Sequence, residues 1–183
     1  GLAPFSMHLA SSMVTVLLNN SLNAYGGDIA ISSMGVINSI TMLILMPVFG
    51  INQGAQPIIG FNYGAKKYDR VKEALNKAII AATSVVIIGF IVTQTMPQKL
   101  FSLFLQKDAD ITEIMEVGVK GLRIYLSMLP IIGFQIVSSN YFQATGKPKQ
   151  ATLLGLSRQV LILIPALIIL PKLFGLTGVW AAG

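Results

Sequence analysis

Four long runs without a charged residue constrain the fold of this chain more than any other feature of its sequence. The runs cover residues 1–27, 29–65, 78–98 and 124–146, and each reaches the roughly 20 residues that a membrane-spanning α-helix needs. Only 11% of all residues are charged, whereas an average soluble domain has about 25%. The sequence therefore predicts an all-α polytopic membrane protein.

The apolar pattern divides the chain into six spans of a single transmembrane lobe, residues 1–183. A Gly26-Gly27-Asp28 turn, Pro97 and the loop 145–149 separate neighbouring spans, because glycine and proline end helices. We expect spans over residues 2–22, 29–61, 74–95, 117–144, 151–170 and 176–183, the last one truncated. Since the sequence begins without Met and stops inside a span, we expect a fragment of a longer transporter-sized chain.

The segment from Met46 to Ile80 predicts a broken helix followed by an elbow. Pro47 and Pro57 each lack a backbone N–H, so we expect them to break or bend the second span. Asn62-Tyr63-Gly64 predicts a tight turn, and a short basic helix that contains Arg70 follows. Pro47, Pro57, Gly64 and Arg70 are therefore the candidate elbow and gating residues.

Basic residues gather in two loops, after the second and after the fourth span: Lys66, Lys67, Arg70, Lys72, Lys147 and Lys149. The positive-inside rule places these loops, and with them the N-terminus of the chain, in the cytoplasm. The elbow cations either only fix this topology or also bind anionic lipid headgroups. The basic residues are too few and too dispersed to indicate nucleic-acid binding.

The sequence contains no catalytic or metal-ligating constellation. His8 is the single histidine, and no carboxylate lies within helical reach of it along the sequence. There is no cysteine, which excludes disulfides and thiolate metal sites. Acidic residues lie in loops or at span ends, with Glu116 at the border of the fourth span. We therefore expect neither an enzyme nor a bound cofactor or metal.

Uncharged polar side chains within the spans are the candidate substrate-binding groups. They form sets at helical spacing in the first, second and fourth spans, among them Ser12, Thr15, Asn19, Asn38, Thr41, Gln135, Ser138, Ser139 and Asn140. Such groups are costly against lipid. They either form hydrogen bonds between helices or line a polar chamber.

Methionines and one arginine complete the candidate groups inside the spans. Met34, Met42 and Met46 are expected to share a face of the second helix, where flexible thioethers suit varied apolar ligands. The candidate substrate-binding set is accordingly Asn19, Asn38, Met42, Gln135 and Ser139. Arg158, inside the fifth span, either snorkels to the interface or pairs with a carboxylate from elsewhere.

Two blocks of the sequence resemble a known transporter family. They are PVFGINQGAQPIIGFNYGAKKYDRVKEAL, residues 47–75, and YFQATGKPKQATLLGLSRQVLILIPALIILPKLFGLTGVWAA, residues 141–182. Together they resemble the multidrug and toxic compound extrusion (MATE) family, in particular its bacterial multidrug efflux branch. The resemblance covers essentially the whole chain.

The resemblance implies half of a multidrug efflux antiporter of the inner (cytoplasmic) membrane. Members of this family have twelve spans in two six-helix lobes, with the substrate cavity between the lobes. They export amphipathic or cationic compounds in exchange for Na⁺ or H⁺. The chain resembles the C-terminal lobe, spans seven to twelve, so its expected partners are drugs or organic cations, the lipid bilayer and the missing N-terminal lobe.

The sequence departs from the family pattern at one point, and three alternatives to a multidrug efflux function remain. No ion ligand carries over, because the first span has no Asp or Glu and the fourth has none in its interior. A lipid-linked saccharide flippase of the same superfamily would need several basic cavity residues, and the chain offers Arg158, Lys120 and Arg123. A membrane-embedded enzyme would need convergent His or carboxylate groups. A non-transport membrane protein is the third alternative.

Overall fold

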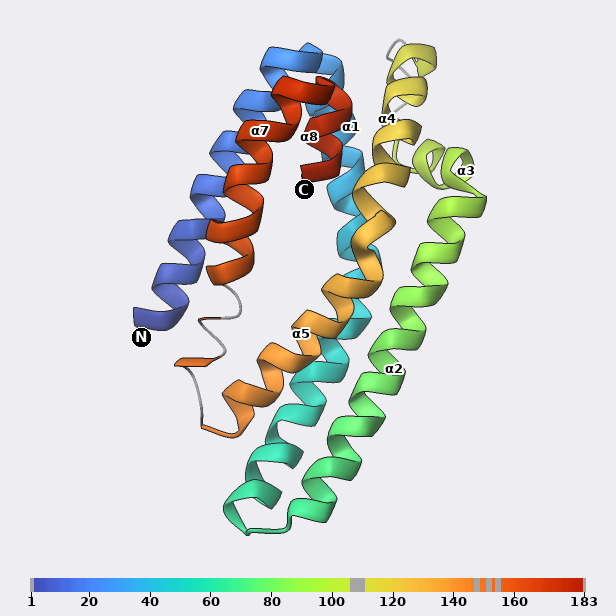
Figure 1. Cartoon of the computed structure of the whole chain (residues 1–183). Coiled ribbons are helices and arrows are strands. Elements are labelled where there is room, and N and C mark those ends of the chain that lie inside the picture. The colour runs from blue at the N-terminus through green and yellow to red at the C-terminus, as the bar shows by residue number, and fades with distance from the viewer. Residues whose placement is uncertain (1, 106–110, 147–148, 151–152, 154–155, 183) are drawn as a thin grey trace.

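The protein is an elongated bundle of helices that cross one another in alternating directions (Figure 1). A computed structural model describes residues 2–105, 111–146, 149–150, 153 and 156–182. Every regular element within these residues is a helix. The fold class is therefore all-α, as the uncharged runs predict.

The first element, α1 (Leu2–Gly64), consists of two antiparallel helices joined at Gly27. Gly27 has φ 60° and ψ −156°, a conformation that is essentially restricted to glycine, and the chain reverses its direction there (Figure 1). We call residues 2–26 the first limb and residues 28–64 the second limb. The second limb is about 55 Å long at 1.5 Å per residue, which exceeds the roughly 30 Å hydrocarbon core.

The expected break at the prolines of the second limb is wrong. Pro47 and Pro57 lie inside helix, and the non-helical residue within α1 is Gly27. The tight turn is also displaced, since the helix continues through Gly64 and the chain turns at 65–67, with Lys66 at φ 56°. A proline removes one backbone hydrogen bond. The second limb packs against α2 and α5 through Ala55 and Ile59 and contacts α4 through Ser33, and this packing stabilises the helix despite the loss.

The third and fourth crossings follow as α2 (Tyr68–Thr95), a short α3 (Pro97–Ser102), α4 (Ile111–Tyr125), the 3₁₀ turn η1 (Leu126–Met128) and α5 (Leu129–Ala144). The turn η1 ends two residues before Pro130, which lies in the first turn of α5. Proline is tolerated in a first turn because the N–H there has no intrahelical partner. The fourth crossing is thus two helices joined by a tightened turn.

The last part of the chain contains the π-helix η2 (Ser157–Leu163), α7 (Ile164–Phe174) and α8 (Leu176–Ala182). Pro165 opens α7 and takes away the N–H that the Leu161 carbonyl would bind in a regular helix. Pro171 lies inside α7, and the chain turns only at Gly175, which has φ 59°.

Several helices are longer than the apolar spans expected for them. The second limb ends at Gly64 and not at residue 61, α2 begins at Tyr68 and not at 74, α4 begins at Ile111 and not at 117, and α7 ends at Phe174 and not at 170. Apolarity marks the part of a helix that lies in hydrocarbon, whereas backbone hydrogen bonding carries the helix on into the polar interface.

One main core joins the limbs of α1 to the later helices. It contains Leu22, Ile37, Leu122, Leu126 and Trp180, all almost completely buried. A smaller cluster around Ile59, Val71 and Ala78 includes Tyr141 and Ala144. The elbow at 65–67 and the end of α5 therefore lie at the same end of the bundle (Figure 1).

Three helices are long and apolar enough to cross a membrane: His8–Gly64, Tyr68–Thr95 and Thr112–Ala144. The first of these contains both limbs of α1, and Val160–Phe174 is a shorter apolar helix. These helices, together with the reversals of the chain, make the protein a multi-pass membrane protein.

Candidate functional site

The second limb of α1 presents one continuous face that no other described part of the lobe covers. Its residues recur at three- and four-residue spacing and are all exposed: Gly35, Asn38, Ser39, Met42, Met46, Phe49, Gly50, Gln53 and Pro57. A Cβ added at Gly35 or Gly50 would have no neighbour within 4 Å. We call this set the open face.

The open face combines soft apolar groups with amides. Met42 and Met46 are 58% and 68% exposed, and Phe49 is exposed beside them. Asn38 and Gln53, about 22 Å apart along the helix axis, lie on either side of these three residues. Pro57 also removes the N–H that would bind the Gln53 carbonyl. The face therefore offers thioethers, an aromatic ring and amide oxygens to a ligand.

The methionine prediction is only partly right. Met42 and Met46 share the open face, but Met34 is 3% exposed and belongs to the main core. At roughly 100° per residue, Met34 lies about 80° round the helix from Met42, which is enough to turn it inward. Sequence reasoning missed Phe49 and Gln53, although their spacing of seven and eleven residues from Met42 was a usable signal.

The first limb also exposes polar side chains, on one side of its open surface. They are His8, Ser12, Thr15, Asn19 and Asn23. The hydroxyl of Ser12 donates to the His8 carbonyl at 2.9 Å, and that of Thr15 donates to the Ser11 carbonyl at 2.9 Å. These two hydroxyls thus bind their own helix.

Two hydrogen bonds that do link different helices come from residues outside the predicted set. The buried Ser33 hydroxyl donates to the Ile114 carbonyl of α4 at 3.5 Å, and the Gln94 amide of α2 donates to the Arg123 carbonyl at 3.0 Å. A single polar residue on an apolar helix gives no signal of its partner, so the sequence did not identify these two bonds.

The five predicted substrate-binding residues lie on three helical segments. Asn19 is exposed on the first limb, Asn38 and Met42 are exposed on the second, and Gln135 and Ser139 are half-buried on α5. Two cavities, of about 690 and 650 Å³, have none of the five in their lining. The side chain of Asn140, which belongs to the same polar set, lies outside the described residues.

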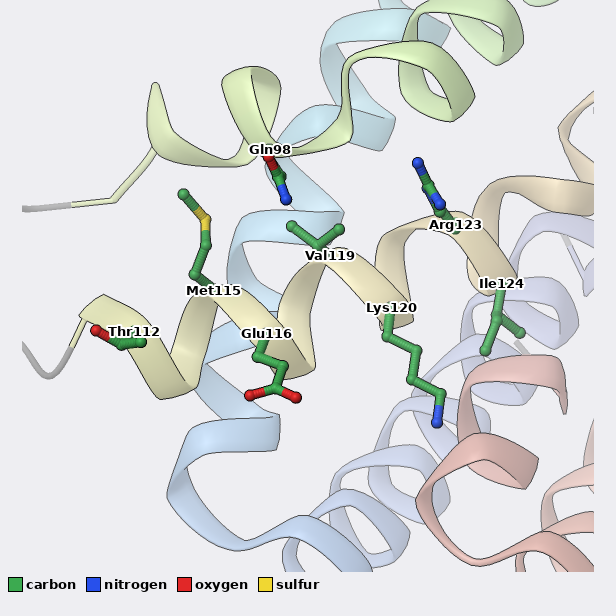
Figure 2. A pocket seen from close by; sticks show the side chains of 8 residues that line it. All are labelled: Gln98, Thr112, Met115, Glu116, Val119, Lys120, Arg123 and Ile124. Carbon is green, nitrogen blue, oxygen red and sulfur yellow. The ribbon is translucent and has the colours of Figure 1, made fainter.

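The larger cavity lies between α3 and α4 (Figure 2). Gln98 extends from α3 toward Val119 of α4, with Arg123 on the same side, whereas Glu116 and Lys120 extend from the other side of α4. This cavity brings a carboxylate and two cations to the end of the bundle opposite the elbow (Figure 1).

The elbow residues occupy different positions. Pro47 and Pro57 are exposed on the second limb, Gly64 is its last residue, and Arg70 lines the cavity of about 650 Å³ between the second limb and α2. Arg158 is half-buried in η2, within electrostatic reach of Tyr125. The part of the chain that the structure describes contains no group of three His, Cys, Asp or Glu residues that could hold a metal ion.

Solved structures of MATE transporters superpose on the whole chain. The MATE multidrug transporter DinF-BH is 39% identical, with a TM-score of 0.83 over 100% of this chain and 40% of its own. The inward-facing conformation of a multidrug resistance MATE family transporter of the MOP superfamily gives a TM-score of 0.85 at 22% identity, over 100% of this chain and 42% of its own. The outward-facing conformation of such a transporter also gives 0.85 at 22%, over 40% of its chain.

Curated relatives also match nearly the whole of this chain over only part of their own length. The multidrug export protein MepA of Staphylococcus aureus is 28% identical over 179 residues, which are 98% of this chain and 38% of that protein. MepA of Staphylococcus saprophyticus is 26% identical over 182 residues, which are 99% of this chain and 39% of that protein. The chain thus spans about two fifths of the length of these relatives. The MatE family model matches residues 4–168, most of the chain, and the chain therefore belongs to the MatE family.

Proposed function

We propose that this chain is the C-terminal lobe of a multidrug exporter and that its open face lines the substrate chamber. The observation that carries the proposal is the uncovered stripe of Asn38, Met42, Met46, Phe49 and Gln53 on a membrane-spanning helix. Membership of the MatE family indicates a transporter and not an enzyme.

The chemistry of the open face argues for a chamber and against contact with lipid. A side-chain amide left without a partner in hydrocarbon costs several kcal/mol. The open face and the first limb together expose several amides, among them Asn19, Asn23, Asn38 and Gln53. A second lobe of the same polypeptide, placed opposite this face, would enclose a chamber in which water and substrate satisfy them. Amphipathic organic cations match the thioethers, the ring and the amide oxygens found there.

The names of the relatives support this substrate class. MepA is a multidrug export protein, and DinF-BH is a MATE multidrug transporter. They do not favour the flippase alternative.

Export in this proposal is driven by Na⁺ or H⁺ and proceeds by alternating access. The chain matches an inward-facing and an outward-facing transporter with equal TM-scores of 0.85, as expected if the lobe keeps its shape while access changes. The coupling carboxylate is assigned to the other lobe, because the open face contains no acidic residue.

In this proposal the protein lies in the inner membrane with its elbow end in the cytoplasm. The elbow belongs to one basic loop, and the end of α5 directly precedes the other. Both lie at the same end of the bundle, as the positive-inside rule requires of two cytoplasmic loops. The N-terminus of the chain is then cytoplasmic as well.

Cysteine labelling of the full-length transporter in membranes tests the chamber directly. The 183 residues of this chain contain no cysteine, and any cysteine in the rest of the full-length protein is first replaced by serine, so that each introduced thiol is the single reactive one. Asn38→Cys, Met42→Cys and Gln53→Cys are expected to react with a small water-soluble thiosulfonate, and ethidium is expected to slow the reaction. Ile88→Cys, at an exposed apolar position of α2, is the control and is expected to stay unlabelled. Equal labelling of Ile88→Cys and Asn38→Cys would contradict the chamber.

Coupling is tested with the same full-length protein in cells. Expression is expected to lower ethidium accumulation, and collapse of the Na⁺ gradient or of the H⁺ gradient is expected to abolish the effect. Export that survives the loss of both gradients would rule out antiport.

A further inference from the structure

The cavity at the elbow has the form of a groove that opens at a charged rim. It measures about 650 Å³ and lies between the second limb of α1 and the first turns of α2. Its wall is apolar and includes Ile51, Ala55, Ile58 and Ala78. Arg70 lies in the first turn of α2, beside the elbow, and Lys77 follows two turns later, about 10 Å further along the helix and next to Ala78. We call these two cations the rim of the groove.

The length of the groove matches one leaflet of a bilayer. Ile51 and Asn62 both line it, and eleven residues of helix span about 16 Å. Half of the roughly 30 Å hydrocarbon core is about 15 Å. Because the elbow follows within a few residues of Asn62, Arg70 lies at headgroup level when the apolar wall lies at acyl-chain level. Lys77 begins deeper along α2, and its long side chain extends its ammonium toward the headgroups.

The rim attracts anions. The elbow and the first turns of α2 hold five cations (Lys66, Lys67, Arg70, Lys72 and Lys77) against the two carboxylates Asp69 and Glu73. The N-terminus of α2 adds the positive end of its helix dipole, and its N-cap residue Lys67 makes no capping side-chain hydrogen bond.

Two of these cations face the groove together with one carboxylate. Lys77 donates a hydrogen bond to Glu73 at 2.7 Å, and both side chains remain largely exposed. The Glu73 carboxylate thus occupies one donor of the Lys77 ammonium. An ammonium has three donors, so two remain for a phosphate, and Arg70 supplies more from the same face of α2.

We propose that this groove binds one phospholipid with an anionic headgroup from the surrounding bilayer. Arg70 and Lys77 hold the headgroup phosphate, and an acyl chain lies along the wall formed by Ile51, Ala55 and Ile58. The cationic rim and the apolar wall of leaflet depth together select a lipid, since a free anion would use only the rim.

Native mass spectrometry of the full-length protein in detergent tests this site. The probes are dioleoyl phosphatidylglycerol, dioleoyl phosphatidylcholine and inorganic phosphate. Phosphatidylglycerol is expected to bind best, and Arg70→Gln or Lys77→Gln is expected to weaken its binding about fivefold each, from the typical energy of one cation near a membrane surface. Glu73→Gln is expected to strengthen binding, because it removes the competing carboxylate.

Two matched variants separate this site from general charge attraction. Lys72→Gln removes the same charge at a residue that does not line the groove, and it is expected to leave binding nearly unchanged. Ile58→Ser changes the wall at a half-exposed position and is expected to weaken lipid binding while the thermal stability of the protein is kept. Three outcomes would each overturn the proposal. The first is an equal loss of lipid binding in Lys72→Gln and Arg70→Gln, and the second is that phosphatidylcholine binds as well as phosphatidylglycerol. The third is that inorganic phosphate displaces the lipid while Ile58→Ser has no effect on lipid binding.

Discussion

At the scale of single residues, glycine has two opposite roles in this lobe. A Cβ added at Gly178 would overlap the Leu170 carbonyl, and one added at Gly121 would lie 2.8 Å from the Trp180 ring. These glycines allow α8 to approach α7 and α4 closely, as small residues do between membrane helices. Gly35 and Gly50 instead border open space, so they keep the open face flat.

Gly178→Ala is expected to destabilise the protein, whereas Gly35→Ala is expected to leave its stability unchanged or slightly raised. Overpacking costs about 1–3 kcal/mol, and at Gly178 the obstacle is backbone, which cannot rotate away. At Gly35 alanine meets nothing within 4 Å and favours the helix by up to about 1 kcal/mol. Thermal unfolding of the purified protein measures both, and equal melting temperatures for the two variants would show that α7 and α8 do not pack as described.

Gln53→Ala is expected to weaken ethidium binding roughly two- to tenfold, the effect of one net hydrogen bond. Gln53 lies exposed on the open face, so the substitution leaves the core intact. Fluorescence titration of the purified full-length protein measures the dissociation constant. Ile88→Ala, which shortens an exposed apolar side chain of α2, is the control, and a similar loss there would remove Gln53 from the site.

At the scale of the elements, the places where a helix is interrupted say more about this fold than the lengths of the helices do. Gly27 ends the first limb with a left-handed φ, η1 tightens the turn before Pro130, and η2 widens the helix before Pro165. By contrast, the helix passes through Pro47 and Pro57 unbroken. Proline therefore marks a possible interruption, and the neighbouring helices decide whether it occurs.

Gly27→Ala is expected to destabilise the reversal between the two limbs by about 1–3 kcal/mol, because φ 60° with ψ −156° suits only glycine. Gly64→Ala is the matched control. Gly64 is the last residue of α1, lies outside the glycines with a positive φ, and has no neighbour within 4 Å of an added Cβ. Expression level and melting temperature report the difference, and an unaffected Gly27→Ala would contradict the reversal geometry described above.

At the scale of the whole molecule, the lobe behaves as one packed body with uncovered faces. Its main core joins the two limbs, α2, α4, α5, α7 and α8, while the open face and the polar side of the first limb have no covering element within the described residues. We expect a densely packed core to move as a unit. The uncovered polar faces need another protein surface or water to form their hydrogen bonds.

Spin labels at both ends of the lobe are expected to show one constant distance through the transport cycle. Asp28 and Lys72 are exposed and tolerate labels because they are outside the core. Asp28 begins the second limb and Lys72 lies in the first turns of α2, just beyond the other end of that limb, so the two residues lie at opposite ends of the bundle. Double electron–electron resonance on Asp28→Cys/Lys72→Cys in the full-length transporter, with and without ethidium, measures it. A second distance that appears with ethidium would show that the lobe itself deforms.

The sequence by itself determined the class of the protein and its family. Uncharged runs of bilayer length leave few alternatives to membrane-spanning helices, because backbone polar groups in hydrocarbon must bind one another. The blocks at 47–75 and 141–182 identified the family to which the chain belongs. Both inferences rest on local composition and order, which a linear chain displays directly.

Only the tertiary structure decided which side of each helix is covered and what lies at the elbow. Met34 and Met42 are alike in sequence, yet one is in the core and the other is on the open face. Likewise, Ile51 and Arg70 are nineteen residues apart and line the same cavity. Burial depends on the rotation of each helix against its neighbours, and packing between distant segments fixes that rotation.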